Sequence, residues 1–142
     1  MRVTFEHERL LVLLISLHSF VVGLMLLLAP EWAVRFGGWA GIDPPFFVRQ
    51  AGIFHLVLVC GYLIEHVRYR GVHLLVTAKL IALVFLLVAS VLDQVPWAVP
   101  ACGLADGAMA AAVLVVHRAV LAHSIPSREA TSAPSSSNVS IT

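Results

Sequence analysis

Four long apolar runs divide the chain, and short stretches with proline, glycine and charged residues separate them. A helix needs about 20 apolar residues to cross a hydrocarbon core of ~30 Å, and each run comes close to that length. The pattern predicts transmembrane helices at about residues 10–28, 46–64, 72–92 and 97–117. Because the connections are short, the predicted fold is an all-α, integral membrane, antiparallel four-helix bundle.

The connections differ in character. The first, residues 31–45, contains Gly37-Gly38 and Asp43-Pro44-Pro45, which break regular structure. Its aromatic residues suit the membrane interface, and we predict a short interfacial helix over residues 30–36. The second connection, EHVRYRG, reads as a polar loop, and the third, DQVP, as a turn.

The two ends of the chain lead to separate expectations. The opening MRVTFEHER resembles the charged start of a signal peptide. The run that follows is too long for a signal peptide and has no small-x-small cleavage site, so we expect a retained helix. Residues 124–142 are rich in serine, proline and alanine and are expected to form a disordered cytoplasmic tail. Residues 1–123 then form one membrane domain.

Composition agrees with a lipid environment. Of the 142 residues, 60% are hydrophobic and 12% are charged, whereas an ordinary soluble domain carries roughly 25% charge. The net charge of +1 leaves no broad basic patch for nucleic acid. Arginine-rich, lysine-poor composition suggests a bacterial protein, and the expected location is the inner (cytoplasmic) membrane.

The arginines are unevenly distributed between the two predicted sides of the membrane. Six lie on the side of the chain ends: Arg2, Arg9, Arg68, Arg70, Arg118 and Arg128. Only Arg35 and Arg49 lie on the other side. Because cytoplasmic loops carry the excess of positive residues, both chain ends are predicted to be cytoplasmic.

Motifs for autonomous catalysis do not occur in the sequence. There is no HExxH and no phosphate-binding GxxxxGK[ST], and Cys60 and Cys102 lie singly inside apolar runs. We therefore expect no metal site, no catalytic residues and no catalytic activity of the chain on its own.

Polar groups at membrane depth are costly, so each one needs a reason. His18 and His55 lie near the middle of their helices, Asp106 lies slightly outward, and Lys79 lies about a third of the way in. Helical periodicity groups polar and small residues into stripes that face the bundle interior. The stripes are Gly52, His55, Tyr62 and His66; Lys79, Ala82, Ala89, Ser90 and Asp93; and Cys102, Asp106, Ala110, Val113 and His117.

Lys79 and Asp106 could form a buried ion pair with the two histidines nearby. Such a pair could simply hold two helices in register, or the Lys79 amine could instead extend to the cytoplasmic interface. A third interpretation is a pocket for an anionic headgroup, a quinone or a proton. The candidate pocket residues are Arg49, Gln50, His55, Tyr62, Lys79 and Asp106.

Haem is a further alternative, because histidine is a common axial ligand of haem iron. His18 and His55 lie at equal depth on neighbouring helices and are the candidate ligands. Against this interpretation, the first helix offers only Gly23 near His18 for the glycine contacts that hold a porphyrin in a bundle.

Three segments, FFVRQAGIFHLVLVCGYL, AKLIALVFLLVASVLDQ and GLADGAMAAAVLVVHR, resemble the DoxX-like group of small bacterial four-helix membrane proteins. The likeness covers roughly residues 10–118 and depends on Arg49, Gln50, Lys79 and Asp106. It implies a quinone-linked oxidoreductase subunit or a partner of redox enzymes. The chain lacks cysteine pairs for redox chemistry of its own. A more distant likeness, of architecture alone, is to the emopamil-binding superfamily, whose members bind sterol-like ligands.

Two functional hypotheses follow. In the first, the chain is an accessory or structural subunit of a larger redox or energy-converting membrane complex, with membrane lipid and other subunits as partners. Small residues of the last helix would contact those subunits: Ala108, Ala110, Ala111 and Ala112. In the second, the chain is a DoxX-like quinone- or lipid-binding component in which Arg49 and Gln50, at the outer end of the second helix, receive a headgroup at the outer face and Lys79 and Asp106 manage protons. A transporter is not favoured, because no inverted repeat or broken helix pair is visible.

Overall fold

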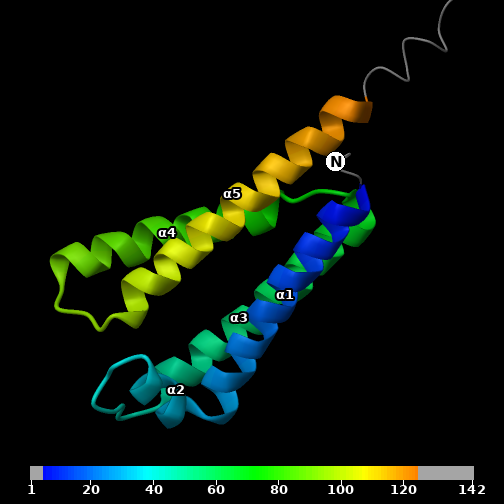
Figure 1. The fold of residues 1–142 in the computed structure, drawn as a ribbon. Coiled ribbons are helices and arrows are strands. Elements are labelled where there is room, and N and C mark those ends of the chain that lie inside the picture. Colours follow the sequence, from blue (N-terminus) through cyan, green and yellow to red (C-terminus); the bar gives the residue numbers. More distant parts are fainter. Residues whose placement is uncertain (1–4, 125–142) are drawn as a thin grey trace, which may run out of the picture.

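The computed structural model describes residues 5–124, and all regular structure in that range is helical. The elements in chain order are α1 (Phe5–Leu28), α2 (Pro30–Phe36), α3 (Phe46–Ile64), the π-helix η1 (Glu65–Tyr69), α4 (His73–Leu92) and α5 (Ala98–Ser124). Figure 1 shows α1, α3, α4 and α5 as four long rods that run alternately up and down. This confirms the predicted all-α four-helix architecture.

Four segments are long and apolar enough to cross a membrane: Phe5–Leu28, Phe46–Tyr69, His73–Leu92 and Ala98–Ala122. Large apolar side chains are exposed along all of them; Val91, for example, is 84% exposed. Water would not stabilise such a surface, and a lipid bilayer would. The chain is therefore a small multi-pass membrane protein.

The predicted and observed helix bounds differ most at the start of α1 and at the end of α5. α1 begins at Phe5 rather than residue 10, and its first turn carries Glu6 and Glu8, which favour a helix start electrostatically. α5 continues past residue 117 to Ser124, through alanine, valine and leucine. The predicted disordered tail falls outside the described residues, apart from Ser124. α2 confirms the predicted interfacial helix at residues 30–36.

The EHVRYRG segment is not the loop that we predicted. Helical backbone continues from α3 into η1 and ends where Arg70 adopts a left-handed conformation, with φ 52°. The side chain of Glu65 then folds onto the start of α4. Its two carboxylate oxygens accept hydrogen bonds from the backbone N–H groups of His73 and Leu74, at 2.9 and 2.8 Å. Glu65 thus caps α4 from eight residues away, a role that sequence-local capping rules do not detect.

Replacing Glu65 with alanine removes this cap and leaves two N–H groups of α4 without their acceptors. We expect the free energy of unfolding to fall by about 1 kcal/mol, as for other lost helix caps. Thermal unfolding in detergent measures this. Glu31→Ala is the matched control, because Glu31 is exposed in the first turn of α2. Equal stability of the two variants would contradict the capping role.

The long helices pack as two pairs, α1 with α3 and α4 with α5. In the first pair Gly23 and Gly52 bring the backbones into contact. A Cβ on Gly52 would lie 2.7 Å from the carbonyl oxygen of Gly23, so only glycine allows this approach. In the second pair Gly103 and Gly107 accept leucine side chains of α4 in the same way.

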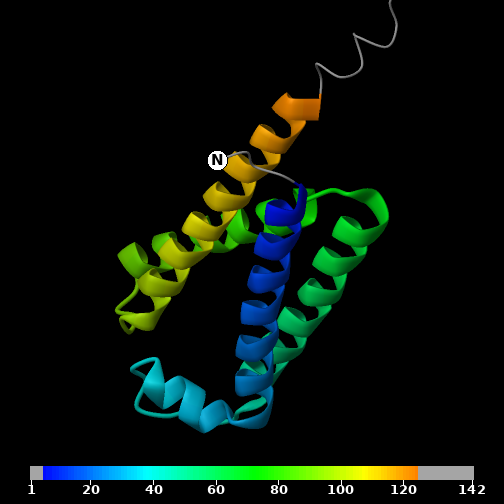
Figure 2. The same cartoon turned by 45° about the vertical axis from the view of Figure 1, so that its right-hand side comes forward.

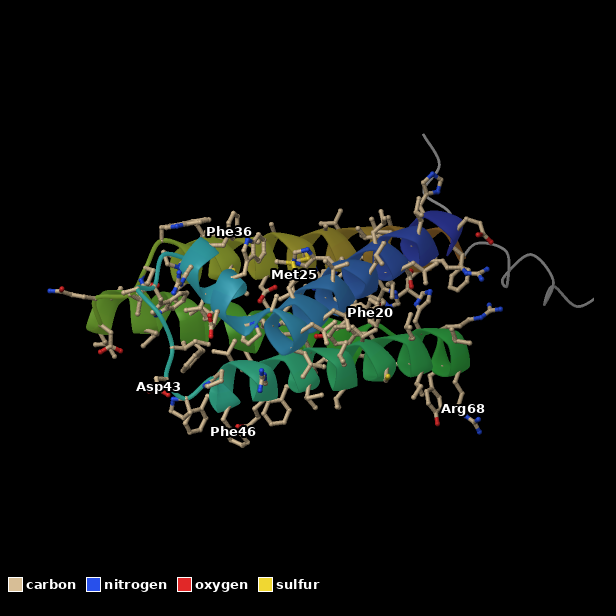
Figure 3. All side chains as sticks on the ribbon, turned by 90° about the horizontal axis from the view of Figure 1, so that it is seen from below. Phe20, Met25, Phe36, Asp43, Phe46 and Arg68 are labelled. Atoms are coloured by element: carbon tan, nitrogen blue, oxygen red, sulfur yellow. The ribbon has the colours of Figure 1, made fainter. Side chains whose placement is uncertain are left out.

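One end of the bundle holds the start of α1, η1 and the end of α5, and we call it the terminal end (Figure 1). The other, the α2 end, holds α2 and the α4–α5 turn. Figure 3 places Arg68 at the terminal end and Asp43 and Phe46 at the α2 end. The buried apolar core lies toward the terminal end: Val12, Ile15, Tyr62, Val72, Leu75, Val76, Ala110 and Val113.

At the α2 end the contact between the helix pairs is made by α2 and its loop rather than by the long helices. Figure 2 shows α2 turning away from α1 toward the α4–α5 turn. The Phe36 ring meets the Trp97 ring edge-on with centroids 6.0 Å apart, and a Cβ on Gly38 would lie 3.0 Å from Pro96. The two pairs are thus packed at one end and bridged at the other.

Candidate functional site

A Lys–Asp pair joins α4 and α5 inside the membrane-spanning region. Lys79 Nζ donates a hydrogen bond to Asp106 Oδ1 at 2.5 Å. The lysine side chain is 5% exposed and the aspartate side chain 15%. Sequence left open whether these groups meet or whether the amine extends to the interface. The structure shows that they meet.

Close packing of α4 on α5 places this pair. A Cβ on Gly107 would lie 2.9 Å from Leu83, and one on Gly103 would lie 3.1 Å from Leu86. These glycines are one residue after Asp106 and three before it, so the backbone of α5 lies close to α4 on this face. Lys79 is the last buried residue along α4, directly beyond the core residues Leu75 and Val76.

Polar groups from both helix pairs surround Lys79 and Asp106. His55 on α3 lies within electrostatic range of both, and of His18 on α1. Tyr62 and Cys102 lie within range of Asp106. We call these six residues the central cluster: His18, His55, Tyr62, Lys79, Cys102 and Asp106. All four long helices contribute to it, whereas the predicted interior stripes covered only the last three.

The central cluster is not sealed. Tyr62 and Lys79 are buried and His55 and Asp106 are half-buried, while His18 and Cys102 are exposed. In a bilayer an exposed side chain at this depth faces lipid or whatever dissolves in lipid. Lysine carries three N–H donors, and one of those on Lys79 is committed to Asp106. The cluster is therefore open to the membrane at His18 and Cys102, whereas Lys79 and Asp106 are largely shielded.

Two of the predicted pocket residues lie elsewhere. Arg49 lines a groove of about 500 Å³ at the α2 end, together with Glu31 and Arg35. Gln50 is exposed beside Arg49 at the start of α3. The predicted pocket residues thus lie in two places, because about one and a half turns of α3 separate Arg49 and Gln50 from His55.

The backbone contact between α1 and α3 bears on the haem alternative. A Cβ on Gly23 would lie 3.0 Å from both the carbonyl oxygen of Gly52 and the Cβ of His55. A porphyrin held between His18 and His55 would need its own thickness of space between these two helices. The glycine contact leaves none there, so the geometry does not favour haem between α1 and α3.

A second polar cluster lies at the terminal end, and we call it the terminal cluster: Glu8, His66 and His117. Glu8 Oε2 lies 3.1 Å from His117 Nδ1, and Glu8 Oε1 lies 3.9 Å from His66 Nδ1. Glu8 is only 1% exposed. Sequence analysis placed the two histidines on interior stripes but missed Glu8. The signal was available, because Glu8 shares the helical spacing i, i+4, i+7 and i+11 with Val12, Ile15 and Ser19, all of which are buried.

Groups of three or more metal-ligating side chains do not occur among residues 5–124 in an arrangement that could hold a metal ion. Cys60 and Cys102 are both free thiols on exposed positions.

Comparison with protein-family models, with curated proteins and with solved structures found no match to this chain.

Proposed function

We propose that this membrane protein binds a hydrophobic molecule with a polar head, of the quinone or lipid class, at the central cluster. The observation that supports the proposal is the Lys79–Asp106 pair with His55, Tyr62 and His18 around it. The resemblance to the DoxX-like group leads to the same class of ligand.

The position of the pair favours binding over a purely structural role. Glycine contacts already hold α4 and α5 together at Gly103 and Gly107. A buried ion pair adds little net stability to such an interface, because its desolvation cost offsets most of the attraction. Charged groups within a membrane are usually retained for a function. Lys79 and Asp106 lie where the buried core along α4 ends, and in the proposal the ligand head reaches them there.

Each residue of the cluster has a distinct part in the proposed site. Lys79 donates to a carbonyl, hydroxyl or phosphate oxygen of the ligand head. Asp106 holds the ammonium group in place and keeps the site close to neutral. Tyr62 and His55 on the opposite helix pair supply further hydrogen-bonding groups, and the exposed apolar side chains of the long helices contact the hydrophobic tail.

Native mass spectrometry of the full chain, extracted gently from its own membranes, tests the proposal. We expect an added mass of one quinone or lipid that survives mild activation. Tyr62→Phe should lower its occupancy several-fold by removing one hydroxyl group. Tyr69→Phe is the matched control, because Tyr69 is 70% exposed at the end of η1. A wild-type protein free of any bound ligand, or equal loss in both variants, would count against the proposal.

An accessory-subunit role is the second candidate, and an exposed small-residue face favours it. Ala101, Ala105, Ala108 and Ala112 are exposed and fall on one face of α5. Such faces allow another membrane helix to approach closely. Ala110, which sequence analysis placed with this group, is instead fully buried in the core. The same mass spectra decide this candidate: it requires other subunits at fixed stoichiometry, and Ala108→Leu should release them.

For location we propose the bacterial inner membrane with both chain ends cytoplasmic. Arg9, Arg68, Arg70 and Arg118 all belong to the terminal end, whereas Arg35 and Arg49 belong to the α2 end. This separation supports the orientation through the positive-inside rule. Labelling of single cysteines at exposed Gln94 and Arg68 from either side of intact membranes tests it, with Arg68→Cys protected from outside and Gln94→Cys labelled.

A further inference from the structure

Glu8 is buried in the terminal cluster with its hydrogen bonding incomplete. Its side chain is 2% exposed. Oε2 meets His117 Nδ1 at 3.1 Å, but Oε1 is buried and has no hydrogen-bond partner in the described part of the chain. His66 is 4% exposed, and neither nitrogen of its ring has a partner there. Phe5 stacks on the same ring, with centroids 5.6 Å apart.

Such an arrangement is stable only if its protons are placed correctly. A carboxylate buried without a positive or donating partner costs several kilocalories per mole, and protonation or pairing removes that cost. Histidine changes its charge within about pH 5 to 8, so it can supply the positive partner in that range. Glu8 thus has two imidazole side chains next to it, at 3.1 and 3.9 Å.

Other ionisable groups border this cluster. On α4, the His73 ring meets the His117 ring edge-on with centroids 6.5 Å apart. Arg70, in the connection before α4, lies over the Phe5 ring at 5.0 Å rather than on Glu8. The other nearby acid, Glu65, is engaged at the start of α4. Glu8 is therefore the carboxylate that His66 and His117 face.

The cluster joins the two helix pairs, which also meet through the apolar core and through the Glu65 carboxylate at the start of α4. Glu8 belongs to α1 in the first helix pair, and His117 belongs to α5 in the second. His66 lies in η1, at the end of α3. The Glu8 contacts therefore lie directly at the junction of the two pairs at the terminal end.

We propose that Glu8, His66 and His117 form a proton-binding site that clamps the two helix pairs together. With a proton on the histidines, the Glu8 carboxylate is ion-paired and the clamp is closed. As the pH rises through the range in which histidine loses its charge, the buried carboxylate loses its positive partner and the clamp loosens. The proposal does not depend on ligand binding at the central cluster.

Double electron–electron resonance on the full chain in lipid nanodiscs tests the clamp. Spin labels are placed at Leu10→Cys on α1 and Leu121→Cys on α5, both exposed, in a Cys60→Ser, Cys102→Ser background. We expect the label–label distance to lengthen, or its distribution to broaden, between about pH 5 and pH 8. The same pH response in Glu8→Gln would overturn the proposal. Glu6→Gln, an exposed carboxylate two residues away, is the control that should keep the response.

A second measurement uses the unaltered protein, in case Glu8→Gln fails to fold. Nitrogen chemical shifts of the histidine rings report their charge and tautomer directly. If the clamp operates as proposed, the ring shifts of His66 and His117 change with pH in step with the label–label distance. If both rings keep one charge and one tautomer across this range, or if the label distance does not change with pH, the site does not bind protons as proposed.

Discussion

Asp106→Ala lowers the free energy of unfolding by about 3 to 5 kcal/mol, the cost of removing one partner from a buried ion pair. The substitution leaves the Lys79 ammonium buried next to the apolar core with no counter-charge. Lys79→Ala should cost a similar amount, because it leaves the Asp106 carboxylate alone. Reversible unfolding by SDS in mixed micelles measures both. Asp93→Ala is the control, since Asp93 is exposed at the end of α4.

A double variant separates stability from function at the same pair. Lys79→Met together with Asp106→Leu replaces both charges with apolar groups of similar volume. Such replacements are often neutral or stabilising, so this protein should unfold within about 1 kcal/mol of the wild type or later. Two single variants as stable as the wild type would mean that the pair is hydrated or open, contrary to its burial.

Gly52→Ala separates α1 from α3 and lowers the free energy of unfolding by about 1 to 3 kcal/mol, the usual cost of overpacking. The new Cβ would lie 2.7 Å from the carbonyl oxygen of Gly23 and 2.9 Å from the backbone nitrogen of Leu27. Backbone atoms cannot move aside as a flexible side chain can, so the two helices must shift. The same unfolding assay measures this cost.

Gly41→Ala provides the matched control for this substitution. A Cβ on Gly41 has no neighbour within 4 Å, and Gly41 lies in the loop before α3. We expect that variant to unfold as the wild type does. If Gly52→Ala also left the free energy of unfolding unchanged, the close backbone contact between α1 and α3 would not exist. The argument against haem between these helices would then fail as well.

The positions of the long helices could be predicted from the sequence because each crossing of a bilayer needs an apolar run of about 20 residues. The second predicted helix begins where α3 begins, since Pro45 precedes it, although helical backbone continues beyond Ile64 into η1. The Lys79–Asp106 contact was within reach for the same reason, because each residue lies on a stripe of polar and small residues. Where a helix crosses the membrane without interruption, the depth of a residue and the helical periodicity are enough to predict which residues face the bundle interior.

Sequence failed where a residue's role depends on partners far along the chain. Glu8 reads as a surface charge near the start of the chain, and only the approach of α5 and η1 buries it. Glu65 likewise reads as part of a polar loop, but its carboxylate caps α4. Arg49 was predicted to receive a headgroup at the outer end of its helix, but its neighbours in the groove, Glu31 and Arg35, come from α2 and were not predicted.

The central cluster and the terminal cluster have no residue in common, but α1 and α5 carry residues of both. The apolar core lies between them, with Val113 of α5 positioned between Asp106 and His117. Opening of the clamp at the terminal end would move α1 relative to α5, and both helices also carry residues of the central cluster. The distance between α1 and α5 at the terminal end and the ligand occupancy of the central cluster can each be measured in the same protein.

Whether the Lys79–Asp106 pair binds a ligand or only joins two helices is decided most directly by ligand occupancy in the Lys79→Met, Asp106→Leu variant. This protein should be as stable as the wild type, so any loss of ligand cannot be attributed to unfolding. We expect native mass spectra of the wild type to carry the added mass of a quinone or lipid and those of the double variant to lack it. Equal occupancy in both proteins would show that the pair is structural and that the ligand, if any, binds elsewhere.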